Sequence, residues 1–254
     1  MNSTCIKTLK YFILFLVFGF TMQSCKTEKK ELEIKDSISL FKAMKDKYDG
    51  KWFQNYTFKQ LTINKDKQER VTDSALWYES VSYPTYFRID RDIEKGNYVI
   101  YRNDSTYNFR NGELYESLDK PATHLLFKGG LYFMSLNESL EKLKKYNYNI
   151  NKFRKDTLKG QAAFVVGDST NQFWLNATYF YCMKRIYTTD NGNKVDVVYD
   201  DFKKLDNGWV EQKVTFYVDG VERLNEFYKE IKTRPMFDSK IYNTSIDYEW
   251  YLNY

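Results

Sequence analysis

The stretch VTDSALWYESVSYPTYFRIDRD, residues 71–92, contains two predicted strands, 71–82 and 86–92, joined by a short turn. Successive side chains of a strand point to opposite faces. Ala75 and Trp77 therefore share one face of the first strand, and the apolar residues that follow each of them share the other. Since both faces of this strand are apolar, we expect more protein to cover one of them and something else to cover the other.

Further strands are predicted on both sides of this stretch, because the two-residue periodicity continues and polar turns separate the apolar runs. The turns Asn191-Gly192, Asn207-Gly208 and Asp219-Gly220 favour tight hairpins. The additional strands are predicted at 52–63, 97–103, 106–110, 153–157, 161–167, 171–175, 179–188, 194–202, 209–218 and 221–232. The sequence thus predicts a mainly β chain of the α+β class with an antiparallel meander.

Three helical segments are expected to cover one face of the sheet. The first begins with an N-cap at Asp36 and runs through Tyr48. A short second helix is predicted at 121–127. Ser135 and Glu138 then form a capping-box pattern that opens a third helix with leucines at helical spacing.

The first 25 residues have the anatomy of a secretory signal, with two lysines before an apolar run at 11–20. The segment ends Met22-Gln23-Ser24-Cys25, which resembles a bacterial lipobox, where a small residue precedes a cysteine that receives lipid. Cys25 is therefore the predicted lipid attachment site. The alternative is an ordinary secreted protein in which Cys25 lies near the cleavage point by chance.

The predicted organisation is a lipoprotein signal peptide at 1–24, a charged tether linker at 25–35, one folded domain at 36–242 and a tail at 243–254. Elsewhere, no apolar run approaches the about 20 residues that a membrane-spanning helix needs. We expect a lipid-anchored protein of the cell envelope, at the outer membrane. The membrane is then one partner, through the anchor, while the periplasmic or surface face and the oligomeric state stay open.

The formal net charge of +5 at pH 7 is spread along the chain and lacks the clustered basic face typical of nucleic-acid binding. No nucleic-acid partner is therefore predicted. Because Cys5 lies in the signal segment and Cys25 would carry lipid, Cys182 is left alone and no intramolecular disulfide is expected. Its aromatic neighbours favour a small buried thiol over a reactive one.

The sequence offers no pattern that predicts catalysis. His124 is the only histidine, so metal sites built from several histidines are excluded, and no metal or cofactor is predicted. The acidic groups around Asp90 and at Asp200-Asp201 lie at predicted strand ends, where acids are common. Gly129-Gly130 lacks the glycine spacing of a phosphate loop. A protein that is not an enzyme is therefore expected.

The segment Tyr83-Pro84-Thr85-Tyr86-Phe87-Arg88-Ile89-Asp90 resembles the corner between two early strands in the Lol-type (LolA-like) lipoprotein carrier superfamily, which includes outer-membrane lipoprotein-sorting-like proteins. Similar patterns recur at 160–175 and at 228–242, so the resemblance covers about residues 36–242. It implies an antiparallel open half-barrel of about 11–12 strands, covered by helices, with an apolar cavity for acyl chains. The functional arginine that precedes the corner proline in the soluble carrier is replaced here by Tyr83.

The leading hypothesis is a non-enzymatic envelope lipoprotein whose half-barrel cavity binds lipid, an acyl chain or a lipidated partner, as in lipoprotein sorting or transport. The residues expected to contact this ligand are Trp77, Tyr83, Phe87, Arg88, Ile100 and Phe109.

Two alternatives stay open at this point. The same aromatic side chains could simply fill a packed core. The protein could also be a surface lipoprotein that binds carbohydrate or protein through exposed aromatics, such as Trp209, Trp250 and the tyrosines of the tail.

Overall fold

The computed structural model describes residues 33–235 and 238–245. The fold described below is that of the unit that begins at residue 34. The predicted signal peptide, the predicted lipid site at Cys25 and most of the predicted linker and tail lie outside the described residues. No helix in the described part is long and apolar enough to cross a bilayer.

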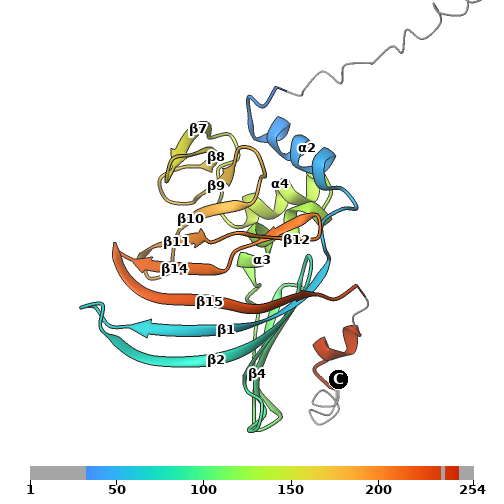
Figure 1. Cartoon of the computed structure of the whole chain (residues 1–254), viewed down its shortest axis with the longest axis vertical. Coiled ribbons are helices and arrows are strands. Elements are labelled where there is room, and N and C mark those ends of the chain that lie inside the picture. Colours follow the sequence, from blue (N-terminus) through green and yellow to red (C-terminus); the bar gives the residue numbers. More distant parts are fainter. Residues whose placement is uncertain (1–32, 236–237, 246–254) are drawn as a thin grey trace, which may run out of the picture. The chain divides into compact units, whose positions relative to one another are not determined.

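One large antiparallel sheet of 13 strands dominates the described unit (Figure 1). Its strand order is β6-β5-β4-β3-β2-β1-β15-β14-β11-β10-β9-β8-β7, and β12 pairs with β13 separately. The strands are β1 (Asn55–Lys65), β2 (Val71–Ser82), β3 (Tyr86–Asp92), β4 (Asn97–Arg102), β5 (Ser105–Arg110), β6 (Glu113–Leu118), β7 (Phe153–Leu158), β8 (Gln161–Gly167), β9 (Gln172–Asn176), β10 (Cys182–Thr188), β11 (Lys194–Asp200), β12 (Lys203–Leu205), β13 (Gly208–Val210), β14 (Lys213–Val218) and β15 (Val221–Thr233).

The sheet is open, because its two edge strands, β6 and β7, do not pair with each other. The chain builds one half outward from β1 to β6, crosses over through the helices, and returns from β7 toward the middle. There β15 pairs with β1, with Tyr228 opposite Gln60. The predicted mainly β half-barrel with covering helices is confirmed.

Three local features differ from the predicted strands, one of which is the short strand β12, for which no strand was predicted. Strand β6 was not predicted; its residues are almost all exposed and none of them is buried. The segment predicted as one strand at 209–218 is divided into β13 and β14 by Glu211 and Gln212. The main sheet therefore has 13 strands where about 11–12 were expected.

The three predicted helices are present: α2 (Ser37–Tyr48), α3 (Thr123–Lys128) and α4 (Leu136–Lys145), with a 3-10 turn η1 (Gly130–Phe133) between the last two. Asp36 caps α2, and its side chain accepts a hydrogen bond from the Ser39 backbone N–H at 2.7 Å. Ser135 and Glu138 form the predicted capping box of α4. Both helices thus begin where the sequence indicates.

The helices lie along one side of the strands (Figure 1), and we call the sheet face that they cover the inner face. Leu40, Phe41 and Met44 of α2 are buried in the same core cluster as strand side chains. Trp52 joins this core to η1, since its ring stacks on that of Tyr132 with 4.2 Å between centroids. An added Cβ at Gly129 would lie 2.7 Å from the ring of Tyr83, so only glycine fits this close approach.

A smaller cluster lies on the opposite, outer face of the sheet. Tyr98, Ile100 and Phe109 pack there under Ile241 and Tyr242, which belong to the short 3-10 turn η2 (Ser239–Tyr242). The C-terminal part of the described chain therefore covers part of the outer face.

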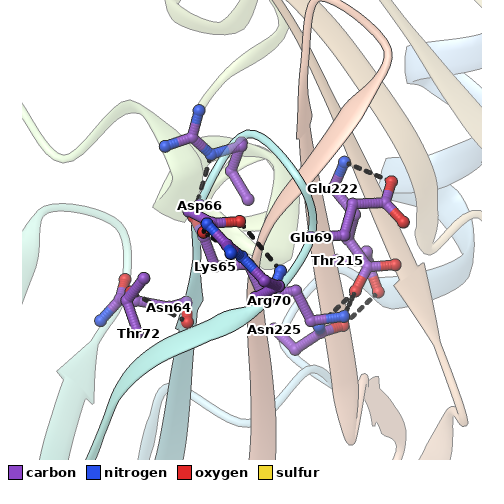
Figure 2. Close-up of polar contacts among 10 residues, drawn as sticks. Asn64, Lys65, Asp66, Glu69, Arg70, Thr72, Thr215, Glu222 and Asn225 are labelled. Carbon is purple, nitrogen blue, oxygen red and sulfur yellow. Dashed lines mark hydrogen bonds and ion pairs between the residues drawn. The ribbon is translucent and has the colours of Figure 1, made fainter.

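Polar contacts hold the far end of the central strands (Figure 2). Asp66, in the turn after β1, accepts hydrogen bonds from the backbone N–H and the Nε of Arg70, at 3.0 and 2.8 Å. Lys65 pairs with Glu222 of β15, and Glu222 in turn accepts from Asn225 at 2.6 Å. These contacts link the β1–β2 hairpin to β15 at the junction between the two halves of the sheet.

Candidate functional site

A cavity of about 330 Å³ lies between the inner face of the sheet and the first turn of α3. This volume is within the range of roughly 300–1,000 Å³ that is usual for ligand sites. Trp77 of β2 lines one side, because its register partner Gln60 and the Tyr228 opposite Gln60 place it on the inner face. The two halves of the sheet both contribute to the wall.

Aromatic rings form a large part of the wall, together with charged and polar side chains. On the β3–β4 side, Phe87 stacks on Tyr101 with 5.5 Å between centroids, and its ring meets that of His124 edge-on at 5.1 Å. On the other side, the rings are those of Tyr187, Tyr199, Phe216 and Tyr228. Such rings offer a large apolar surface with few rotatable bonds.

A chain of polar contacts lies at the β15 side of the cavity. Lys128, at the end of α3, forms a buried ion pair with Glu211 at 2.7 Å and donates to the hydroxyl of Tyr228 at 2.5 Å. That hydroxyl donates to Glu226 at 2.8 Å. These contacts attach α3 to β15 and to the segment between β13 and β14, and Glu211 compensates the charge of Lys128.

Two carboxyl groups of the cavity favour the neutral form. Burial, followed by the charge of Glu226, raises the pKa of Glu79 well above its usual value. Burial likewise raises the pKa of Glu226. A buried carboxyl group keeps its proton to higher pH because the charged form is poorly solvated.

The basic groups of the cavity behave differently from one another. Burial, and then the charges of Lys128 and Arg185, hold the pKa of His124 well below its usual value, so the imidazole is neutral. Arg185 of β10 has 5% of its surface exposed, and its guanidinium lies over the rings of Phe127 and Tyr187 at 5.2 and 4.6 Å. The Nε of Arg185 is buried and has no hydrogen-bond partner in the described residues.

Two of the six residues predicted to contact a ligand, Trp77 and Phe87, line the cavity. Tyr83 does not line the cavity: it is buried against Gly129, and its hydroxyl donates to that of Tyr56 at 3.3 Å. Their role in binding stays a prediction.

The other three predicted contact residues, Arg88, Ile100 and Phe109, point to the outer face. Arg88 is fully buried there, pairs with Asp90 at 2.9 Å and donates to the backbone oxygen of Ile241 at 3.0 Å. In this arrangement the three residues hold β3, β4 and β5 to the C-terminal turn, away from the cavity.

Charged residues beyond those predicted from the sequence also line the cavity, among them Glu79, Lys128, Arg185 and Glu226. Glu79 carried a usable signal, because it has the same strand parity as Ala75 and Trp77 and so belongs on their face. No local signal identifies Arg185, since its position in the cavity depends on the long-range pairing of the strands.

Other reactive groups in the described part of the chain are few. Cys182 is buried, as expected, and burial raises the pKa of its thiol to about 12, which keeps the thiol protonated. No group of three or more His, Cys, Asp or Glu side chains is placed to hold a metal ion in the described residues.

Comparison with known proteins gives matches in structure only. No family model matches the chain, and no curated protein matches its sequence. A DUF1329 family protein from Desulfovibrio piger ATCC 29098 has a TM-score of 0.56 at 10% identity, over 82% of this chain and 96% of that one.

Two further solved structures match over a similar share of the chain. A LolA superfamily protein from Nitrosomonas europaea has a TM-score of 0.54 at 11% identity, over 83% of this chain and 98% of that one. A putative outer membrane lipoprotein-sorting protein domain from Vibrio parahaemolyticus has a TM-score of 0.54 at 14% identity, over 82% and 94%. At these identities the likeness concerns the fold alone: this chain shares its fold with the LolA superfamily protein and with the lipoprotein-sorting protein domain.

Proposed function

We propose that this protein is a non-enzymatic lipoprotein of the cell envelope that holds a lipid, an acyl chain or a lipidated partner in the inner-face cavity. The observation that carries the proposal is the cavity of about 330 Å³ with aromatic walls. Burial of apolar surface contributes roughly 25 cal/mol per Å². An acyl chain laid against Trp77 and Phe87 would gain this contribution.

The proposed location rests on the first 25 residues. A signal peptide that ends at Ser24-Cys25 would leave the domain anchored through lipid on Cys25. The protein named for outer membrane lipoprotein sorting supports an envelope location, because its fold is shared by this chain. The proposed binding function is compatible with a carrier, a receptor or a sensor.

Binding of a neutral apolar probe tests the proposal. N-phenyl-1-naphthylamine should bind the purified protein with a rise in fluorescence, and dodecanol should displace it. Ala122→Trp, which places an indole at the α3 side of the cavity, should weaken probe binding at least tenfold.

Val71→Trp is the matched control, because Val71 lies on β2 outside the cavity and is 63% exposed. It should bind the probe as the wild type does. Failure of the wild type to bind, or wild-type binding by Ala122→Trp, would overturn the proposal.

A second candidate function is recognition of carbohydrate through surface aromatics. Tyr179 is exposed and lies 4.7 Å from the ring of Trp209, and Tyr181 stacks on Phe202 at 3.8 Å. Such a cluster suits the flat face of a sugar ring. Glycan-array binding that disappears in Trp209→Ala, while probe binding in the cavity is unchanged, would favour this candidate. Trp250, also predicted for this role, lies outside the described residues.

A further inference from the structure

The cavity contains a buried cation whose charge is not compensated by an acid. Arg185 is 5% exposed, lines the cavity, and its Nε has no hydrogen-bond partner in the described residues. A guanidinium carries five N–H donors. Buried charges are normally paired or hydrogen-bonded, because removing an ion from water is costly. A buried arginine in a cavity wall, with its Nε lacking a hydrogen-bond partner in the described residues, is suited to binding an anion.

The neighbours of Arg185 satisfy it only in part. The rings of Phe127 and Tyr187 stabilise the cation through their faces, but an aromatic ring carries no net negative charge and does not replace a carboxylate. The other groups that act electrostatically on it are the phenols of Tyr148 and Tyr199 and the thiol of Cys182. Burial keeps the protons on all three, so none supplies a negative charge.

The acids of the cavity lie elsewhere. Glu211 pairs with Lys128, and Glu226 accepts from Tyr228. Glu79 is on β2, five strands from β10 in the sheet order. The β10 side of the cavity is thus electropositive, and the lowered pKa of His124, caused first by burial and then by Lys128 and Arg185, agrees with this.

We propose that the Arg185 guanidinium binds the oxyanion head group, carboxylate or phosphate, of a single-chain amphiphile whose chain lies along Trp77 and Phe87. Guanidinium groups hold both oxyanions through paired N–H donors. One chain is the better fit because the volume of about 330 Å³ is at the lower end of the roughly 300–1,000 Å³ of ligand sites. This inference rests on the proposed lipid-binding function and defines its ligand class.

Displacement of N-phenyl-1-naphthylamine by a series of twelve-carbon competitors tests the inference. Dodecanoate and dodecyl phosphate should each displace the probe at least tenfold better than dodecanol, and dodecyltrimethylammonium should be the weakest. The stronger of the two anions identifies the natural head group as carboxylate or phosphate. Acetate and inorganic phosphate should not displace the probe, since they lack the chain.

Arg185→Gln should abolish the preference for anions over dodecanol while the probe still binds. Arg185→Lys should keep part of that preference, because it keeps the charge without the paired donors. Arg110→Gln is the matched control: Arg110 lies over the ring of Tyr115 at 4.8 Å but is exposed and outside the cavity. It should behave as the wild type does.

Equal displacement by dodecanoate, dodecyl phosphate and dodecanol in the wild type would overturn the inference and leave the proposed function standing. An unchanged preference in folded Arg185→Gln would do the same. If Arg185→Gln does not fold, Arg185→Lys and the wild-type series decide. Absence of probe binding in the wild type is a different result, which removes the proposed function itself.

Discussion

Glu79 shows how the cavity changes the chemistry of a single residue. It is 3% exposed on β2, and burial raises its pKa well above the ordinary 4.5. At pH values between 4.5 and the raised pKa of Glu79, the folded protein binds more protons than the unfolded chain. The free energy of unfolding therefore falls as pH rises through this range.

Glu79→Gln should remove this pH dependence, because glutamine has nearly the shape of a protonated glutamate and does not titrate. We expect the free energy of unfolding of the variant, relative to that of the wild type, to increase from pH 5 to pH 8. The increase is about 1.4 kcal/mol for each pH unit of that interval that lies below the raised pKa of Glu79. Urea denaturation at both pH values measures the gain. Glu116→Gln, on exposed β6, is the control, and an equal difference at the two pH values would contradict the expectation.

Strand parity explains how far the site could be predicted from sequence. Trp77 and Phe87 line the cavity. Arg88 follows Phe87 directly, so the two side chains must face opposite sides of β3, and both could not line one cavity. The Arg88–Asp90 pair at 2.9 Å follows from the same rule. In contrast, the position of Arg185 in the cavity depends on which strands surround it, and strand parity does not determine that.

At the scale of elements, local signals predicted the helices well. The capping residues Asp36 and Ser135 identified the starts of α2 and α4, because their side chains bond the first backbone N–H groups. β6 carried no such signal: it is an edge strand with charged residues and no buried face. Short α3 was also predicted, but its attachment to the sheet through Lys128 was not.

The Lys128–Glu211 pair should anchor α3. Both side chains are largely buried, at 7% and 4% exposure. Lys128→Met leaves Glu211 buried without its partner, and loss of one member of a buried pair costs about 3–5 kcal/mol of stability. The double variant Lys128→Met/Glu211→Leu should recover most of this loss, since an apolar pair of similar volume is often tolerated.

Urea denaturation of the two single variants and the double variant measures this coupling. Lys95→Met is the control, because Lys95 pairs with Asp92 at the surface and should matter little. A double variant as unstable as the sum of the single variants would show that the pair does not act as a unit.

At the scale of the whole described unit, the cavity lies where the two halves of the sheet meet. β2, β3 and β4 supply one wall, and β10, β11, β14 and β15 supply the other. The halves are joined by β1 and β15. Their paired residues, for example Asn64 and Leu224, are separated in the sequence by more than half of the length of the chain. Hairpin turns predict which neighbours pair, but nothing local predicts this central contact. The position of the cavity therefore could not be predicted from sequence.

The proposed function places this unit at the cell envelope, and this location depends on a lipid anchor at Cys25. One thioether-linked diacylglycerol gives two chains, and each buried CH₂ contributes about 0.8 kcal/mol to membrane binding. The linker 26–35 attracts anionic lipids weakly, because glutamates alternate with its lysines. Cys25→Ser should therefore abolish labelled-palmitate incorporation and leave either uncleaved precursor or protein in the soluble fraction. Lys26→Ser, beside the anchor, should keep both label and membrane retention. Unchanged labelling and retention in Cys25→Ser would refute the lipid anchor, and with it the proposed envelope location.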